Sequence, residues 1–269
     1  MSYRKNSNVL ETNLNKNGVM RFNLNSPENL NALSENMMDS IQYSLDKASL
    51  DKNVRVIIIA GEGSTFSSGH DLKELKDARK NTDKGKKYFL KIMKKCSKMM
   101  QTIIKCPKPI IAEVAGTATA AGCQLVASCD LAYASNLAKF ATPGVNIGLF
   151  CSTPMVAISR NLTNKHSMEM LLTGELISSN KAAEIGLIND VVEGIKLKDF
   201  VLDKAQKISK KSSVTLKIGK EAFYKQLDMN LSDAYDYASN VMVENMLKLD
   251  AKEGIEAFIE KRKPNWQDK

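Results

Sequence analysis

Three short apolar runs, separated by helical patterns, restrict this chain to a narrow set of folds. They cover residues 54–60, 110–115 and 131–134. An apolar run that does not alternate with polar residues is typical of a parallel strand buried on both faces. Gly61 ends the first run, and Pro107 and Pro109 block helix formation just before the second. Strand, helix and strand therefore alternate at spacings that suit right-handed βαβ units.

The N-terminal part adds a hairpin and a helix. Residues 9–24 contain Asn17 and Gly18 between alternating apolar residues, which is a strong hairpin signal. Ser34 is a preferred N-cap residue for the helix that follows. The apolar residues that share one face of this predicted helix are Met37, Ile41, Leu45 and Ala48.

Helical patterns dominate from residue 167 onward. The expected segments are 167–172, 180–185, 197–210, 213–227, 231–249 and 254–261. We find neither an internal repeat nor a low-complexity tract in the sequence. We therefore predict two parts, an α/β core over residues 1–195 and a C-terminal helical region over residues 196–269.

The formal charge of +9 raises nucleic acid or an anionic membrane as partners. Around the densest lysine region, residues 80–98, the apolar residues form one helical stripe, namely Phe89, Ile92, Cys96, Met99 and Ile103. The lysines are therefore expected on the solvated face of a helix. Aromatic residues make up only 6% of the chain and do not interleave with a basic motif, so we expect no nucleic-acid partner.

The cysteines and the first residues of the chain indicate in which cell compartment the protein is expected. The five cysteines, an odd number without C-x-x-C spacing, argue against a disulfide framework and predict buried thiols. The first six residues contain neither an apolar signal core nor an Arg-rich leader, so we expect a cytoplasmic protein unless a leader has been removed. Apolar stretches such as residues 56–60 are too short to span a membrane.

Two segments, residues 66–73 and 120–124, place small residues where backbone N–H groups can approach a ligand. Two N–H groups that face one point form an oxyanion hole, which stabilises negative charge developing on a carbonyl oxygen. The second segment heads a predicted helix, where the N–H groups lack intrahelical partners and the dipole favours an anion.

Nine motifs appear together in one order and spacing. They are residues 25–33, 56–60, 66–73, 108–112, 120–130, 140–148, 169–174, 182–188 and 253–258. Together they resemble the enoyl-CoA hydratase/isomerase (crotonase) family over residues 9–266. The resemblance implies a crotonase-like spiral of ββα units, an α/β fold, whose C-terminal helices build homotrimers that often pair as homohexamers. It also implies an acyl-CoA thioester as substrate or ligand, without a further cofactor.

The resemblance assigns the oxyanion-hole donors to the amides of His70 and Ala121. Further substrate-binding positions would be Ser68, Asp71, Leu72, Lys73, Gly122, Phe258 and Lys261. Asp71 could instead fix its loop, since Asp readily accepts from nearby backbone N–H groups. Lys73 could face a coenzyme A phosphate or solvent, and Phe258 and Lys261 could simply belong to a packed helix with a solvated lysine.

Hydratases of the family carry two glutamates, at the positions of Gln124 and Gly144 here. Gln124 cannot take a proton, although its amide could orient water, and Gly144 offers no side chain. Losing a general acid or base costs about 10²–10⁴ in rate, so efficient hydration by the usual mechanism is not expected.

Other groups could replace the missing glutamates. Relatives that run other reactions place an aspartate near positions 151 and 152, which are Cys151 and Ser152 in this chain. A nucleophilic Cys151 would need a lowered pKa and a partner base, and the alternative is buried packing. Some naphthoate-forming relatives with glycine at the position of Gly144 use bound bicarbonate, so an exogenous anion is another option.

The two histidines support neither a Ser–His–Asp arrangement nor a metal site. The imidazole of His70 could take a catalytic role or merely pack, and His166 is expected to be structural. Two functions stay open. One is an enoyl-CoA hydratase-like lyase or isomerase with unusual acid and base groups. The other is a non-catalytic acyl-CoA-binding or regulatory protein of fatty-acid metabolism. In either case a basic surface would attract the phosphates of coenzyme A.

Overall fold

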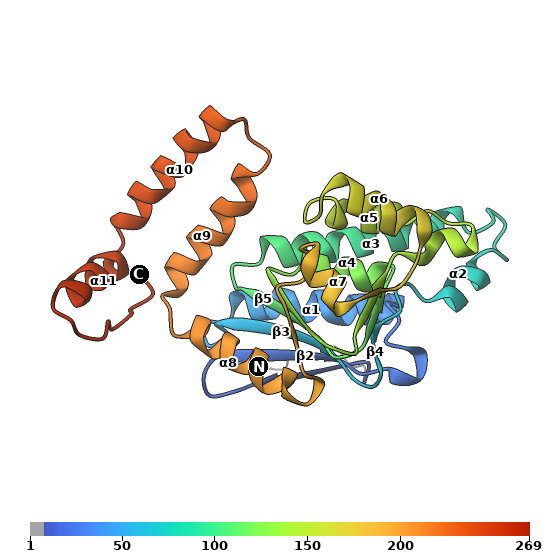
Figure 1. The fold of residues 1–269 in the computed structure, drawn as a ribbon, viewed down its shortest axis with the longest axis horizontal. Coiled ribbons are helices and arrows are strands. Elements are labelled where there is room, and N and C mark those ends of the chain that lie inside the picture. The colour runs from blue at the N-terminus through green and yellow to red at the C-terminus, as the bar shows by residue number, and fades with distance from the viewer. Residues whose placement is uncertain (1–7) are drawn as a thin grey trace.

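The computed structural model of the protein describes residues 8–269 and contains two sheets surrounded by helices (Figure 1). The larger sheet has the order β1 (Leu10–Leu14), β2 (Val19–Leu24), β3 (Val56–Gly61), β5 (Ile110–Val114), β7 (Leu131–Ser135) and β10 (Asp190–Val192). The smaller has the order β4 (Thr65–Ser67), β6 (Thr117–Thr119), β8 (Lys139–Ala141) and β9 (Ile177–Ser178). The first six residues, on which the leader interpretation rests, lie outside the described residues.

Consecutive strands divide between the two sheets in a repeating way. The pairs β3–β4, β5–β6 and β7–β8 each give one strand to each sheet, and helices follow each pair. The first pair is followed by α2 (Leu72–Ala78) and α3 (Lys86–Lys105), and the second by α4 (Ala121–Ser128). The third is followed by the 3₁₀ helix η2 (Pro143–Ile147), α5 (Ser152–Ile158) and α6 (Asn164–Thr173). The expected spiral of ββα units is therefore confirmed.

The three apolar runs are the parallel strands β3, β5 and β7, which pair in that order. In β3, Ile57 and Ile59 pack into the main core, whereas Val56 and Ile58 face the cluster under α8 (Gly194–Ser209). Both faces of the strand are buried, which explains why its sequence does not alternate.

The hairpin and the two predicted amphipathic helices are also confirmed. Strands β1 and β2 pair antiparallel around Asn17 and Gly18. The Ser34 hydroxyl accepts from the Met37 amide at 3.2 Å and caps α1 (Glu35–Leu50), which follows the 3₁₀ helix η1 (Pro27–Asn29). Helix α3 buries the predicted stripe except Phe89, which is half-buried, and its lysines lie mostly on the exposed face. All five cysteines are buried and free.

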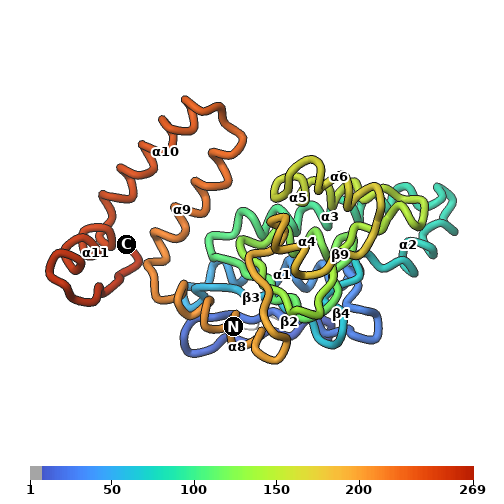
Figure 2. The backbone as a smooth tube through the Cα atoms, in the orientation of Figure 1, coloured from blue at the N-terminus to red at the C-terminus, as the bar shows by residue number. Residues whose placement is uncertain are grey.

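The C-terminal part contains α7 (Ser179–Glu184), α8, α9 (Ser213–Gln226), α10 (Leu231–Met246) and α11 (Leu249–Ile259). The predicted helical segments are present, whereas the short strands β9 and β10 lie where only helices were expected. The predicted division after residue 195 falls inside α8, which packs on the large sheet through Leu197, Val201 and Ala205. Helices α9 and α10 contain no buried residue and extend away from the core (Figure 2).

Candidate functional site

The loop after β4 and the loop after β6 lie against each other. Strands β4 and β6 are paired, and the Thr119 hydroxyl donates to the Ser68 carbonyl oxygen at 3.1 Å. A Cβ on Gly122 would lie 2.2 Å from the Ser67 carbonyl oxygen, which no real side chain could tolerate. A Cβ on Gly69 would lie 3.1 Å from the Ala121 nitrogen. Glycine at positions 69 and 122 is therefore required by this contact.

The backbone of both loops adopts conformations that are rare for most residues. Gly69 has a φ of +92°, and Ala120 has a φ of +50° and a ψ of −120° just before α4. A non-glycine residue in such a conformation costs about 1–3 kcal/mol and is typical of functional sites. Among residues 8–269, no acceptor contacts the amide N–H of His70 or of Ala121. Two free donors thus flank the contact between the loops.

Asn31 holds the turn between β3 and β4, which leads into the first loop, and the sequence did not suggest this role. Its side-chain oxygen accepts from the Ser26 amide at 2.8 Å, and its side-chain nitrogen donates to the carbonyl oxygens of Glu62 and Thr65. Two residues later, the Leu33 amide donates to the Gly69 carbonyl oxygen at 2.7 Å. The only sequence signal was the residue type, because Asn tolerates the positive φ of 49° found here.

The imidazole of His70 is enclosed. Neither ring nitrogen makes a well-formed hydrogen bond among the described residues, although the Leu33 backbone is a close polar neighbour, and both are shielded from solvent. Burial lowers the pKa of His70, which favours the neutral ring at pH 7. A neutral imidazole has one donor and one acceptor nitrogen, so His70 has the chemistry to exchange a proton, while both of its nitrogens are enclosed in this structure.

The two positions of the absent glutamates differ in what surrounds them. Gln124 is buried on α4, where the Cys96 thiol of α3 approaches its side-chain oxygen at 4.0 Å. A Cβ on Gly144 would lie 2.6 Å from the Leu149 carbonyl oxygen and 2.9 Å from the Cys151 sulfur. The loop after β8 is therefore built around glycine, and no carboxylate could be added at position 144 without moving this loop.

Within residues 8–269, neither candidate replacement shows a contact with a base. Burial raises the pKa of Cys151, the opposite of what a nucleophilic thiol needs. Ser152 is exposed, and its hydroxyl donates to the Phe150 carbonyl oxygen at 3.3 Å. The fully buried Cys123 is close enough to Cys151 to interact with it electrostatically, and burial raises its own pKa to about 12.

The carboxylates nearest to the first loop are held by structural hydrogen bonds. Asp71 caps α2 by accepting from the amides of Lys73 and Glu74. The Glu74 carboxylate accepts from the Glu35 amide and from the Tyr88 hydroxyl, at 3.0 and 3.1 Å. The side chains of Leu72 and Lys73 are exposed at the start of α2.

Phe258 and Lys261 do not join these loops within one chain. Phe258 is 85% exposed on α11, and Lys261 lies just beyond the end of this helix. Helix α11 and helix α2 lie at opposite ends of the long axis of the molecule (Figure 1). In a single chain, these two residues are therefore separate from the other predicted site residues.

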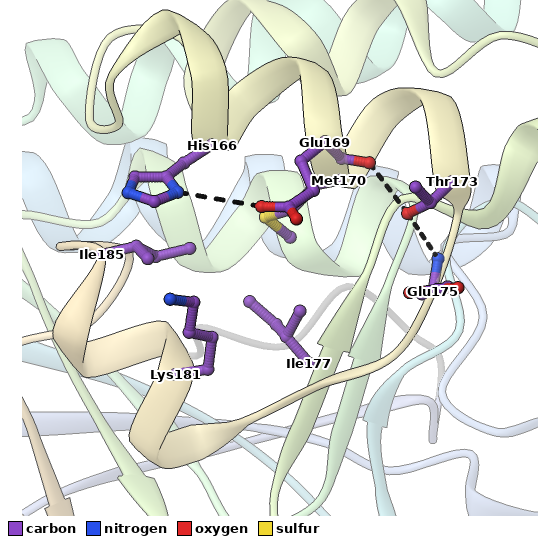
Figure 3. Close-up of a pocket in the computed structure, with 8 residues that line it drawn as sticks. All are labelled: His166, Glu169, Met170, Thr173, Glu175, Ile177, Lys181 and Ile185. Atoms are coloured by element: carbon purple, nitrogen blue, oxygen red, sulfur yellow. Dashed lines mark hydrogen bonds and ion pairs between the residues drawn. The ribbon is translucent and has the colours of Figure 1, made fainter.

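A small cavity between α6 and α7 is lined by His166, which was expected to be structural, and by none of the predicted site residues (Figure 3). The imidazole of His166 lies 3.8 Å from the Glu169 carboxylate, and the side chains of Lys181 and Ile177 close the opposite wall. The volume of this cavity, about 90 Å³, is far below the several hundred Å³ typical of ligand pockets. Among residues 8–269 we find neither a metal-binding cluster of His, Cys, Asp and Glu nor a helix suited to crossing a bilayer.

Comparison with known proteins extends over nearly the whole chain. Residues 14–269 match the model of the family described as enoyl-CoA hydratase/isomerase. Mitochondrial enoyl-CoA hydratase domain-containing protein 3 from Xenopus laevis is 49% identical over 249 residues, which are 93% of this chain and 83% of that protein.

Two crystal structures show the same fold. Human enoyl-coenzyme A hydratase domain-containing protein 3 gives a TM-score of 0.91 at 44% identity, covering 96% of this chain and 100% of that one. An enoyl-CoA hydratase from Mycobacterium smegmatis gives a TM-score of 0.92 at 41% identity, covering 97% and 99%.

The comparison corrects the expected compartment. The Xenopus relative, like its mouse and human counterparts, is named as mitochondrial, so the expectation of a cytoplasmic protein is wrong. That expectation rested on the composition of six residues, which is a weaker sign than 49% identity across 249 residues.

Proposed function

The chain belongs to the enoyl-CoA hydratase/isomerase family, and we propose that it binds an acyl-CoA thioester where the β4–α2 and β6–α4 loops meet. The thioester carbonyl oxygen would accept from the amides of His70 and Ala121. The observation that carries this proposal is the pair of donors without acceptors beside the contact between Gly69 and Ala121. Donors fixed by the backbone stabilise a developing enolate oxygen without reorganising, and losing one costs about 10²–10³ in rate.

Under this proposal Ser68, Asp71, Leu72, Lys73 and Gly122 line or support the thioester site. Asp71 would act by capping α2, since its carboxylate is already occupied by two backbone amides. Phe258 and Lys261 would reach a site only on a second copy of the chain. The exposed apolar residues of α9–α11 support a homotrimer or homohexamer in which this happens.

We propose that any turnover is of the lyase or isomerase type and uses the His70 imidazole to move the proton. Cys151 and Ser152 are weaker candidates. Burial raises the pKa of the Cys151 thiol, and Ser152 offers only an exposed hydroxyl. Bound bicarbonate or another anion stays an alternative. The names of the relatives support a mitochondrial setting, and we propose a role in fatty-acid metabolism.

A specific observation favours a second candidate function, acyl-CoA binding without catalysis. Gly144 is packed against Leu149 and Cys151, so the place of the second glutamate is closed rather than merely empty of a side chain. A protein that had only to hold a thioester would keep the amide donors and need neither carboxylate.

Two assays on the full chain separate these functions. Hydration of crotonyl-CoA is followed by loss of its enoyl absorbance, and binding of the unreactive butyryl-CoA is measured by calorimetry. Turnover would support the lyase and should then be lost in His70→Gln. Binding without turnover would support the binding protein or a different acyl group. If butyryl-CoA does not bind, both candidates fail.

The variant Gly69→Ala tests the donors themselves. Its methyl group would lie 2.9 Å from the Ala120 Cβ and would separate the two loops. We expect at least about a 10²-fold loss of turnover or a clear loss of affinity. The matched control is Gly186→Ala, since Gly186 has a similar φ of +87° but its Cβ would meet nothing closer than 3.7 Å. Equal behaviour of the two variants would contradict the assignment.

A further inference from the structure

Each of the two donor amides is oriented by the carbonyl group of its own peptide. The His70 N–H shares a planar peptide with the Gly69 carbonyl, whose oxygen accepts from the Leu33 amide at 2.7 Å. The Ala121 N–H shares a peptide with the carbonyl of the preceding residue, whose oxygen accepts from the Gln124 amide at 3.0 Å. The N–H and C=O of a trans peptide point in opposite directions, so each of these bonds fixes the direction of one donor. Neither bond fixes the distance between the two donors.

The strands that carry the two donors stop pairing with each other before the donors are reached. The last paired residues of β4 and β6 are Ser67 and Ala118, and the register of this ladder is irregular. Closer to the donors, the described residues contain a single hydrogen bond between the two segments, from the Thr119 hydroxyl to the Ser68 carbonyl oxygen at 3.1 Å. Thr119 and Ser68 each lie two residues before a donor. This bond therefore connects the two loops at equivalent positions.

The second loop is not held in place by backbone preference. Ala120 has a φ of +50° and a ψ of −120°, a strained conformation that persists only where the surroundings determine it. Its amide donates to the Ala141 carbonyl oxygen at 2.9 Å, which holds the loop on the side of β8. On the side of the first loop, contact between Gly69 and the Ala120 Cβ limits how near the loops can come. The Thr119 hydroxyl bond is what keeps them from separating.

We propose that Thr119 is a positioning residue, whose hydroxyl sets the separation of the His70 and Ala121 amides by donating to the Ser68 carbonyl oxygen. The inference deepens the proposed function and rests on it, because a fixed separation matters only if one oxygen accepts from both amides. Such an oxygen must lie about 2.7–3.1 Å from each donor nitrogen. A displacement of one loop by about 1 Å is enough to remove one of the two bonds, and a misplacement of this size costs about 10²-fold in rate. Thr119 acts through Ser68 and does not touch the ligand.

Three variants of the full chain test this role. Thr119→Val keeps the shape of the side chain and removes the hydroxyl, whereas Thr119→Ser keeps the hydroxyl. The matched control is Thr142→Val. The Thr142 hydroxyl, just after β8, also donates to a carbonyl oxygen of another segment, that of Met170 at 2.8 Å, and neither segment carries a donor. Circular dichroism checks that all three proteins are folded.

Infrared spectroscopy and calorimetry with butyryl-CoA, labelled with ¹³C at its carbonyl, separate positioning from stability. The C=O stretching frequency of the bound thioester falls when its oxygen accepts hydrogen bonds, so it reports the alignment of the donors. Thr119→Val is expected to lose most of this downward shift and to bind about tenfold more weakly, which corresponds to about 1.4 kcal/mol for one hydrogen bond. Thr119→Ser should retain the shift. Thr142→Val should retain it too, with less than about a twofold change in affinity.

A full downward shift in Thr119→Val would overturn the role of Thr119. An equal loss in Thr119→Val and Thr142→Val would overturn it as well, because any broken hydrogen bond in the fold would then have the same effect. A loss in Thr119→Ser would show that the hydroxyl is not what matters. These three results leave the proposed function intact. If the unchanged protein binds butyryl-CoA without a downward shift, or does not bind it, the proposed function fails and this inference fails with it.

Discussion

The spiral core and the C-terminal arm, defined here as α9–α11, are held in different ways. The core buries long apolar runs on both faces of the large sheet, and side chains such as Phe22 and Phe140 are completely inaccessible. Helices α9 and α10 bury no residue, although they carry large apolar side chains such as Phe223, Met242 and Met246. Burial of apolar surface thus stabilises the core, whereas helices α9 and α10 must depend on something else.

A small polar cluster is one of the ties between the arm and the core, beside the ion pair of Arg55 with Asp268. The Lys220 ammonium group donates to Asp130 at 2.7 Å and to the carbonyl oxygens of Ile103 and Lys108. The Tyr224 hydroxyl donates to the other Asp130 oxygen at 2.9 Å. Hydrogen bonds fix orientation but bury little apolar surface, so the arm is directed by the core while its own apolar residues stay available. This difference agrees with the proposed homotrimer, in which a second copy would cover them.

The largest expected effect is in the core. Phe22→Ala removes a completely buried ring and should lower the free energy of unfolding by about 3–5 kcal/mol, because a cavity remains. The loss is measured by urea unfolding of Phe22→Ala and of the unchanged protein at several protein concentrations. If Phe223→Ala, in the arm, destabilised a dilute monomer as strongly, the distinction between the two regions would be broken.

The next largest effect is at the cluster that joins the regions. Lys220→Met leaves the Asp130 carboxylate with one counter-charge fewer in a site where the two side chains are only 8% and 16% exposed. We expect a loss of about 2–3 kcal/mol, somewhat below that of a fully buried pair. Lys217→Met, at an exposed position of the same helix, should change unfolding by less than about 0.5 kcal/mol. Two variants with indistinguishable unfolding curves would show that the cluster does not anchor the arm.

A smaller effect concerns the exposed apolar face of the arm. Met242→Asp is expected to weaken self-association about tenfold or more, which corresponds to about 1.4 kcal/mol, without changing the unfolding of the dissociated chain. Sedimentation velocity over a range of concentrations provides the measurement. A variant that assembles as well as the unchanged protein would place the interface elsewhere.

The smallest effect is on the pH dependence of stability. The core and the arm are expected to lose stability in different pH ranges. Burial lowers the pKa of His70, so the unfolded chain takes up a proton as the pH falls below about 6.5 while the folded core resists it. The core should therefore lose stability on acidification through this range, and His70→Gln should remove the loss. His166→Gln, which changes the half-exposed histidine, is the control, and the idea fails if it has the same consequence.

The arm should respond only in stronger acid. Its Glu253 carboxylate bonds to Arg262, which lowers the pKa of Glu253 to about 2. The contribution of this pair is present above the ordinary pKa of about 4.5 and is lost as the pH falls toward 2. Urea unfolding of Glu253→Gln between these limits tests the assignment, and no difference from the unchanged protein would reject it.

The sequence by itself determined the parts of the protein that follow from local patterns. Unbroken apolar runs specified the parallel strands, the Ser34 cap and the helical stripes specified the helices, and the small residues of 66–73 and 120–124 marked two loops for close approach. These features depend on spacing over a few residues, which a single chain displays directly. The order of the motifs was sufficient to indicate the family.

Only the tertiary structure decided which of these parts meet. Gly69 lies against Ala121 although some fifty residues separate them, and within one loop Cys151 folds back onto Gly144, which no spacing of residue types reveals. The strands of the second sheet are too short to leave a periodic signal, and α8 packs on the large sheet instead of leaving with the arm. These contacts depend on the packing of the whole chain. The tertiary structure therefore determines the geometry of the candidate site, which the spacing of residues along the sequence does not.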